Sequence, residues 1–204
     1  LAASKDAEYR KVLNASALNI PDGMGLLYAS KFLKKLGKTD VTLKERVTGT
    51  DLAIKLIHLS KHENFSIFFL GASEESNGKT IEYAKRHGAK VAGGFIENPD
   101  SAKCFKTING ANPDLLLVAL NFPRQEKWIS AHLGKLPSVK LAIGIGGAFD
   151  FIAGARKRAP RALRALGLEW LYRLFQEPKR IKRIWNAVIV FPLKIILSSR
   201  KHAG

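Results

Sequence analysis

Acidic, basic and amide side chains stand beside turn sequences at several points of this chain. Asp22 precedes Gly23 in the sequence Pro-Asp-Gly-Met-Gly, and Arg46 opens the sequence Arg-Val-Thr-Gly-Thr-Asp-Leu. An Asp-Gly pair by itself indicates a turn, and an exposed arginine is usually solvated surface. If Arg46 instead lies at a strand end near Asp22, its guanidinium group could bind a diphosphate through paired hydrogen bonds.

Gln125 and Glu126 follow Pro123 and Arg124, and we expect them to open a helix. A helix N-terminus favours carboxylates and can meet a ligand. No Asp-x-Asp sequence occurs in the chain, although enzymes that bind Mg²⁺ with substrate phosphates hold the metal through carboxylates. We therefore expect no metal and no cofactor. If a diphosphate binds to this chain, we expect arginine or lysine to balance its charge.

The cations that could supply this charge lie near the C-terminus: Arg156, Lys157, Arg158, Arg173, Arg180 and Arg183. On one helix the last three would share a face, because they are spaced by seven and three residues. Pro178 is expected to start a new helix, however, which would bend that face. Residues 151–204 carry thirteen Lys and Arg against two Glu, within a chain of net charge +17. Such asymmetry indicates a polyanionic partner, which on charge alone is a nucleic acid, an anionic membrane or a phosphate-rich substrate.

The elements that must position these residues alternate between strands and helices. Apolar runs at 65–70, 115–120 and 139–145 predict buried strands, Val91 begins another, and helices are expected at 74–87, 101–109 and 125–133. Strands that are apolar throughout are buried on both faces, so we predict an α/β fold with an open, doubly wound, mostly parallel Rossmann-like sheet. Ligands bind beyond the carboxyl ends of such strands, where we expect glycine turns at 71–73, 93–94 and 144–147. A short strand is also expected at 19–23.

Two lesser candidates favour structural roles. Cys104 is the chain's one cysteine, which excludes an internal disulfide, and a lone cysteine is more often a buried small residue than a nucleophile. His58 and His62 have a spacing that could bind a metal. No third ligand is evident, so a solvated helix end is the favoured interpretation.

The sequence predicts that residues 168–204 form an appendage to the sheet domain. Residues 186–197 are apolar apart from Asn186 and Lys194, but twelve residues span only about 18 Å as a helix, against a hydrocarbon core of ~30 Å. Aromatic and basic residues precede them, which is typical of a helix lying on an anionic membrane surface. We predict a catalytic domain over residues 1–167 and a basic amphipathic helical appendage over residues 168–204.

Four motifs in order resemble one family. Pro-Asp-Gly-Met-Gly, Arg-Val-Thr-Gly-Thr-Asp-Leu, Pro-Arg-Gln-Glu-Lys-Trp and the closing stretch 141–183 are similar to those of the WecG/TagA/CpsF glycosyltransferases, glycosyltransferase family 26. The resemblance implies an inverting enzyme that moves N-acetylmannosamine, or a related sugar, from a UDP-sugar donor. The implied acceptor is N-acetylglucosamine on undecaprenyl diphosphate, in cell-surface polysaccharide synthesis such as the teichoic acid linkage unit. The implied location is peripheral, on the cytoplasmic face of the bacterial membrane.

The resemblance also implies roles for individual residues. Asp22 would be the catalytic base and Arg46 a catalytic pocket residue. Substrate binding is expected of Gly23, Gly49, Asp51, Gln125, Glu126, Gly146, Gly147, Arg173, Arg180 and Arg183.

One departure from the family keeps other functions open. The family has upstream strands that end in a Thr-x-Asn-like segment, which this sequence lacks. We therefore expect either a piece of a longer protein or an incomplete pocket. An inactive homologue that binds only UDP-sugar or membrane remains an alternative, and so does a basic nucleic-acid-binding module. The latter leaves the glycine-lined strand ends unexplained, so no nucleic acid is expected as a partner. A homo-oligomer also stays open.

Overall fold

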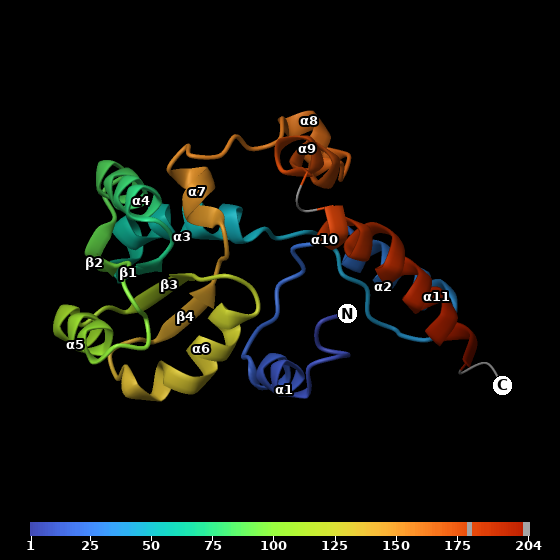
Figure 1. Cartoon of the computed structure of the whole chain (residues 1–204), viewed down its shortest axis with the longest axis horizontal. Coiled ribbons are helices and arrows are strands. Elements are labelled where there is room, and N and C mark those ends of the chain that lie inside the picture. The colour runs from blue at the N-terminus through green and yellow to red at the C-terminus, as the bar shows by residue number, and fades with distance from the viewer. Residues whose placement is uncertain (179–180, 202–204) are drawn as a thin grey trace.

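A parallel sheet lies in one part of the molecule, at the left in Figure 1. Within residues 1–178 and 181–201, which the computed structural model describes, four parallel strands are paired in the order β2–β1–β3–β4. They are β1 (Ser66–Gly71), β2 (Lys90–Phe95), β3 (Leu115–Ala119) and β4 (Leu141–Gly144). Leu115 of β3 pairs with Ile67 on one side and with Leu141 on the other.

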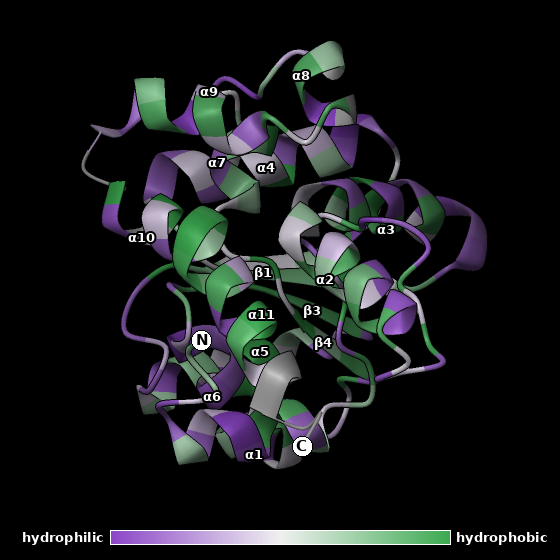
Figure 2. Ribbon diagram, turned by 90° about the vertical axis from the view of Figure 1, so that its right-hand side faces the viewer, coloured by the Kyte–Doolittle hydropathy of each residue, from purple (hydrophilic) through white to green (hydrophobic). Residues whose placement is uncertain are grey.

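Helices cover both faces of this sheet. The helices on one face are α3 (Gly49–Glu63), α4 (Glu74–Arg86) and α7 (Ala148–Ile152). The other face carries α5 (Ala102–Ala111) and α6 (Arg124–His132), which the short 3₁₀ turn Leu133–Lys135 follows. Alternate residues of β1 enter the two cores, so that Phe69 faces α3 and α4 while Phe68 faces α5, and Figure 2 shows β3 and β4 in the hydrophobic colour. The predicted doubly wound α/β fold is confirmed.

Side-chain caps begin the helices that flank the sheet. The hydroxyl groups of Thr48, Ser73 and Ser101 each accept a hydrogen bond from a backbone N–H in the first turn of α3, α4 and α5. Such caps satisfy donors that have no partner inside the helix. Left-handed residues Asn64 and Asn112 end α3 and α5, so local sequence defines these elements at both ends.

Two expectations for individual segments were wrong. Gly93 and Gly94 lie inside β2 and not in a turn after it. Both pack closely against the core, because an added Cβ atom would lie 3.1 Å from Phe68 Cε2 at Gly93 and 2.7 Å from Asn77 Oδ1 at Gly94. Residues 19–23 form no strand. They run extended beside residues 45–48 and are tied to them by the bond from Val47 N–H to the Pro21 carbonyl, at 3.1 Å.

The remaining helices lie outside the two layers that cover the sheet. Helix α1 (Ala7–Ala15) packs on α6, and α2 (Met24–Lys35) packs on α11 (Phe191–Lys201). Between α7 and α11 the chain forms α8 (Arg161–Ala165), α9 (Glu169–Gln176), α10 (Ile181–Trp185) and a π-helical turn, Asn186–Val190. Figure 1 shows α10 and α11 running beside α2, away from the sheet. Among the described residues, no helix is both long and apolar enough to cross a membrane.

The glycine packing in β2 gives a first prediction. Gly94→Ala should lower the free energy of unfolding by about 1–3 kcal/mol, the usual cost of adding a methyl group to a filled core, because the hydrogen bonds of Asn77 to β1 carbonyls prevent that side chain from moving away. Gly78→Ala is the matched control, since Gly78 lies in α4 with nothing within 4 Å of the added Cβ. It should gain about 0.5–1 kcal/mol from its helix propensity. Urea unfolding measures both, and equal stability of Gly94→Ala and the parent would contradict the packing argument.

Candidate active site

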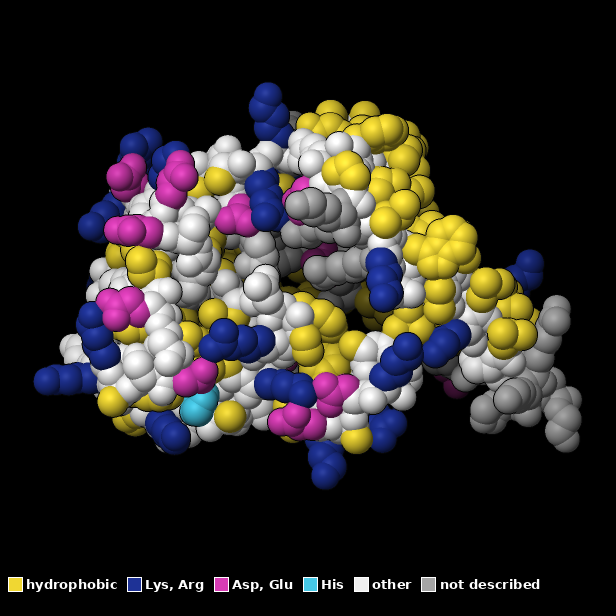
Figure 3. All heavy atoms as spheres, viewed as in Figure 1, with side chains coloured by type: hydrophobic (Ala, Val, Ile, Leu, Met, Phe, Trp, Pro, Cys, Tyr) yellow, Lys and Arg dark blue, Asp and Glu magenta, His cyan; other side chains and the backbone are white. Residues whose placement is uncertain are grey.

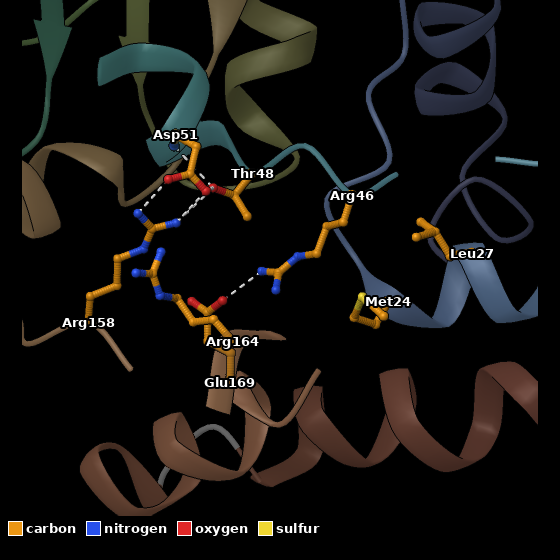
Figure 4. Close-up of a pocket in the computed structure, with 8 residues that line it drawn as sticks. All are labelled: Met24, Leu27, Arg46, Thr48, Asp51, Arg158, Arg164 and Glu169. Atoms are coloured by element: carbon orange, nitrogen blue, oxygen red, sulfur yellow. Dashed lines mark hydrogen bonds and ion pairs between the residues drawn. The ribbon is translucent and has the colours of Figure 1, made fainter. Parts of the chain in front are cut away.

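A pocket of about 420 Å³ opens where α2, the start of α3 and the segment containing α8 and α9 meet (Figure 4). Its lining residues come from segments far apart in the chain and are Met24, Leu27, Arg46, Thr48, Asp51, Arg158, Arg164 and Glu169. Polar and charged side chains form one wall, while Met24 and Leu27 of α2 form an apolar side. The pocket lies at the carboxyl end of the sheet, because the start of α3 packs against residue 145, which follows β4.

The first charged group of the pocket is built on the N-terminus of α3. Thr48 caps this helix, and its hydroxyl also donates a hydrogen bond of 2.7 Å to Asp51. Arg158 binds the same carboxylate through two parallel bonds of 2.6 Å, one from each terminal nitrogen. The Arg158 hydrogen bonds lower the pKa of Asp51 to about 2. Asp51 is therefore an ionised carboxylate whose charge Arg158 already balances.

The second group joins the C-terminal segment to the loop that carries Arg46. Glu169, at the start of α9, has a side chain only 7% exposed, and it accepts 2.7 and 2.9 Å hydrogen bonds from Arg46 and Arg173. Burial alone would raise the pKa of Glu169, but the hydrogen bond from Arg46 and the charges of both arginines outweigh burial and hold the pKa below its ordinary value. Glu169 is thus a buried anion shared by two cations.

The candidate base Asp22 lies at the edge of this group. Its Oδ1 atom is 3.6 Å from Arg46 Nη2, and Arg46 Nε donates a hydrogen bond to the Asp22 backbone oxygen. Surrounding protein atoms desolvate the carboxylate and raise the pKa of Asp22, although Arg46 opposes the shift. The side chain is 67% exposed to water, which screens both effects. The structure brings Asp22 and Arg46 together beside Gly23, which caps α2.

The expected binding residues Gln125, Glu126, Gly146 and Gly147 do not line the pocket; they lie in the segments that follow β3 and β4. Gln125 is buried, and its side chain accepts a 2.8 Å hydrogen bond from Gly146 N–H and donates one of 2.9 Å to Glu126. Both ends of this amide are therefore occupied within the protein, where they tie α6 to the loop after β4. Gly49 also has a packing role, because a Cβ there would lie 3.1 Å from the Ile145 carbonyl oxygen. A substrate contact by these residues stays a prediction.

The expected break near Pro178 is present, so Arg173 in α9 and Arg183 in α10 lie on separate helices. Helix α9 ends at Gln176, and Glu177 leaves helical geometry with φ −135° and ψ 75°. Arg173 is committed to Glu169 and also lies over the ring of Phe151, 4.9 Å from its centroid. Arg180 lies outside the described residues, and so does the side chain of Arg183 in α10.

The two lesser candidates have structural surroundings. His58 contacts Tyr83 Oη at 3.2 Å and stacks on His87, and Cys104 is fully buried, which raises the pKa of its thiol to about 11. In the described part of the chain, no group of three or more His, Cys, Asp or Glu side chains could hold a metal ion. Independence from metal remains a prediction.

Sequence reasoning overlooked Thr48 and Arg164 as pocket residues. For Thr48 a signal existed, since Thr-Gly-Thr-Asp places a capping hydroxyl three residues before an acid at a helix start. Arg164 has no such signal. It lines the pocket because the fold brings it to the same cavity as Thr48 and Asp51 at the start of α3.

The shared carboxylate of Glu169 supplies a second prediction. Glu169→Gln keeps the shape but leaves two arginines facing a neutral amide, so the free energy of unfolding should fall by about 1–3 kcal/mol. Glu82→Gln is the control, because Glu82 also pairs with an arginine four residues away but is 63% exposed, and it should cost less than about 0.5 kcal/mol. Chemical denaturation of the two variants is the measurement. Equal losses would show that Glu169 behaves as a surface pair.

Sequence comparison relates this chain to known bacterial enzymes. The chain is similar to N-acetylglucosaminyldiphosphoundecaprenol N-acetyl-beta-D-mannosaminyltransferases from three bacteria. The protein from Bacillus spizizenii strain W23 is 32% identical over 205 residues, covering 98% of this chain and 74% of the relative. The Bacillus subtilis strain 168 protein is 35% identical over 188 residues, with 90% and 70% covered. The Staphylococcus aureus strain MRSA252 protein is 31% identical over 204 residues, with 98% and 76% covered.

The family comparison covers nearly the whole chain. Residues 1–203 match the glycosyl transferase WecG/TagA/CpsF family. This span includes both charged groups of the pocket, the Asp22–Arg46 pair and the C-terminal helices. The chain therefore belongs to the WecG/TagA/CpsF family of glycosyltransferases.

Proposed function

We propose that this protein transfers N-acetylmannosamine from a UDP-linked donor to N-acetylglucosamine carried on undecaprenyl diphosphate. The names of the similar proteins describe this sugar and this acceptor. The observation that carries the proposal for this chain is the pairing of Asp22 with Arg46, 3.6 Å apart and next to a pocket lined by further arginines. That arrangement combines a proton acceptor with cations suited to a diphosphate.

In the proposed reaction Asp22 takes the proton of an acceptor hydroxyl group. The acceptor oxygen then forms a bond to the anomeric carbon of the donor, and the bond from that carbon to the diphosphate oxygen breaks. UDP leaves with the electron pair, and one in-line displacement inverts the anomeric centre. The raised pKa of Asp22 suits a base, because a more basic carboxylate accepts a proton more readily.

Arg46 has two roles in this proposal. Its ion pair with Glu169 holds the guanidinium group in place, and the same group faces Asp22, so that it favours the ionised base before the reaction. Fixed cations can also stabilise the charge that develops on the leaving diphosphate. They would then perform the task that a metal performs in other nucleotide-sugar enzymes.

A product assay tests this function directly. UDP release should be measured with UDP-N-acetylmannosamine and other UDP-sugars, each with and without lipid-linked N-acetylglucosamine. We expect release only with the mannosamine donor and the lipid-linked acceptor together. Release that does not depend on the acceptor, or binding without turnover of any donor, would refute the proposed transfer.

The role of Asp22 leads to a prediction about pH. Asp22→Asn should lower kcat by about 10²–10⁴, the usual contribution of a positioned base. Because the pKa of Asp22 is raised, kcat/KM of the parent should fall with acidification at a pH above the ordinary carboxyl value of 3.8. The residual activity of the variant should lack this acid limb. Steady-state rates across pH measure both, and an unchanged acid limb in Asp22→Asn would assign it to another group.

We also propose that the C-terminal helices bind the membrane surface, at its cytoplasmic face. Figure 3 shows hydrophobic side chains gathered over α8, α9 and α10, with basic side chains nearby. Trp185 and Leu193 are 58% and 53% exposed. Large apolar side chains that face solvent beside cations fit an anionic bilayer surface. An acceptor anchored in the bilayer would meet the pocket there.

This surface generates a further prediction. Trp185→Ser combined with Leu193→Ser should weaken binding to anionic phospholipid vesicles more than tenfold, because burying each large apolar side chain contributes ~1.5–3 kcal/mol. Leu141→Ser is the control, since Leu141 is 48% exposed at the start of β4, away from these helices. Vesicle sedimentation measures the effect. Equal binding by the double variant and the control would place membrane attachment elsewhere.

A further inference from the structure

Three arginine side chains line the pocket, and the protein neutralises two of them. Arg46 binds Glu169, and Arg158 binds Asp51. Both pocket carboxylates are therefore occupied by arginines other than Arg164. Among the residues that the structure describes, Arg164 forms no side-chain hydrogen bond and no ion pair, and its Nε atom is buried without a partner.

Arg164 is nevertheless directed into the pocket. It projects from α8 between the Asp51–Arg158 pair and Glu169 (Figure 4). Its charge reaches Asp51 and contributes to the low pKa of that carboxyl group, although no hydrogen bond joins them. The Arg158 and Arg164 guanidinium groups thus act on the same side of the pocket, and one of them has no counter-ion.

An unpaired, partly buried guanidinium group is costly. A buried donor without a hydrogen-bond partner destabilises the protein, and more so when it is charged. The cost disappears when an anion enters, and the guanidinium fork matches a phosphate group in shape as well as charge. Met24 and Leu27 form the apolar side of the same pocket, so a ligand with both phosphate and apolar parts would contact both.

We propose that Arg164 binds the phosphate groups of a substrate diphosphate in this pocket. The proposal rests on the proposed glycosyl transfer and adds a binding residue to it. Diphosphate chemistry is common to the nucleotide donor and the lipid-linked acceptor, and Arg164 suits either. Arg173, which the sequence favoured for this role, is less suited because Glu169 and Phe151 already hold it.

Calorimetric binding separates the two sources of diphosphate. The variants are Arg164→Gln, which removes the charge, and Arg164→Lys, which keeps the charge without the fork. Arg10→Gln is the matched control, because it removes the same charge from an exposed position on α1. Each variant of the full chain is titrated with UDP and, separately, with a water-soluble short-chain prenyl diphosphate. Thermal unfolding of each variant verifies that the fold is kept.

We expect Arg164→Gln to weaken the binding of one of the two ligands by about 10–100-fold. This fold-change corresponds to the loss of a charge-assisted hydrogen bond of ~1.5–3 kcal/mol. Arg164→Lys should recover part of the loss, and Arg10→Gln should bind as the parent does. A loss confined to UDP assigns Arg164 to the donor, and a loss confined to the prenyl diphosphate assigns it to the acceptor. Unchanged affinity for both ligands in a folded Arg164→Gln variant overturns the proposal.

Turnover separates this inference from the proposed function. If the parent binds diphosphate through Arg164 but transfers no sugar, the function is wrong and the binding residue stands. If the parent transfers sugar and Arg164→Gln matches it in KM for both substrates, the function stands and the role of Arg164 is wrong.

Discussion

The carboxylate of Glu169 lies between Arg46 and Arg173, nearly excluded from water, and the rest of the site depends on it. Removing an anion from water is expensive, so this position is tolerable only while both guanidinium groups remain in place. One of them, Arg46, contacts Asp22, and the other is in the same short helix as Glu169. The ion pairs therefore couple residues 22, 46 and 169, which belong to segments far apart in the chain. If they separate, Asp22 loses its neighbouring cation and α9 loses its attachment.

This coupling explains how an open carboxyl end of a sheet becomes a pocket. Strand order and helix packing place the start of α3 at the end of β4. The segment with α8 and α9 completes the pocket, because Arg158 pairs with Asp51 and Glu169 pairs with Arg46. Buried ion pairs add little net stability compared with apolar packing. Here the ion pairs fix the position of the C-terminal segment over the pocket, because they connect it to Asp51 and to Arg46.

The sheet could be predicted from sequence because its signals are local. Residues 67–70 and 115–119 are apolar without alternation, which a strand buried on both faces requires. The glycines of β2 were misassigned because a glycine that admits Phe68 looks the same in sequence as one that makes a turn. Arg164 could not be identified at all. Its importance comes from what its neighbours leave unpaired, and that depends on contacts between residues more than a hundred positions apart.

The glycines at the strand ends illustrate how backbone packing and chemistry are related in this fold. Gly49 lets α3 begin against the Ile145 carbonyl, and Gly144 leaves room for the Gln125 amide, which a Cβ would meet at 2.8 Å. Gln125 can then accept the Gly146 N–H and hold the loop after β4. Because α3 begins so close to that loop, its cap residue Thr48 and its first acid Asp51 project into the pocket, where Arg158 meets them. The glycines at the strand ends thus set how closely α3 lies against the loop after β4, and that position brings Thr48 and Asp51 to Arg158.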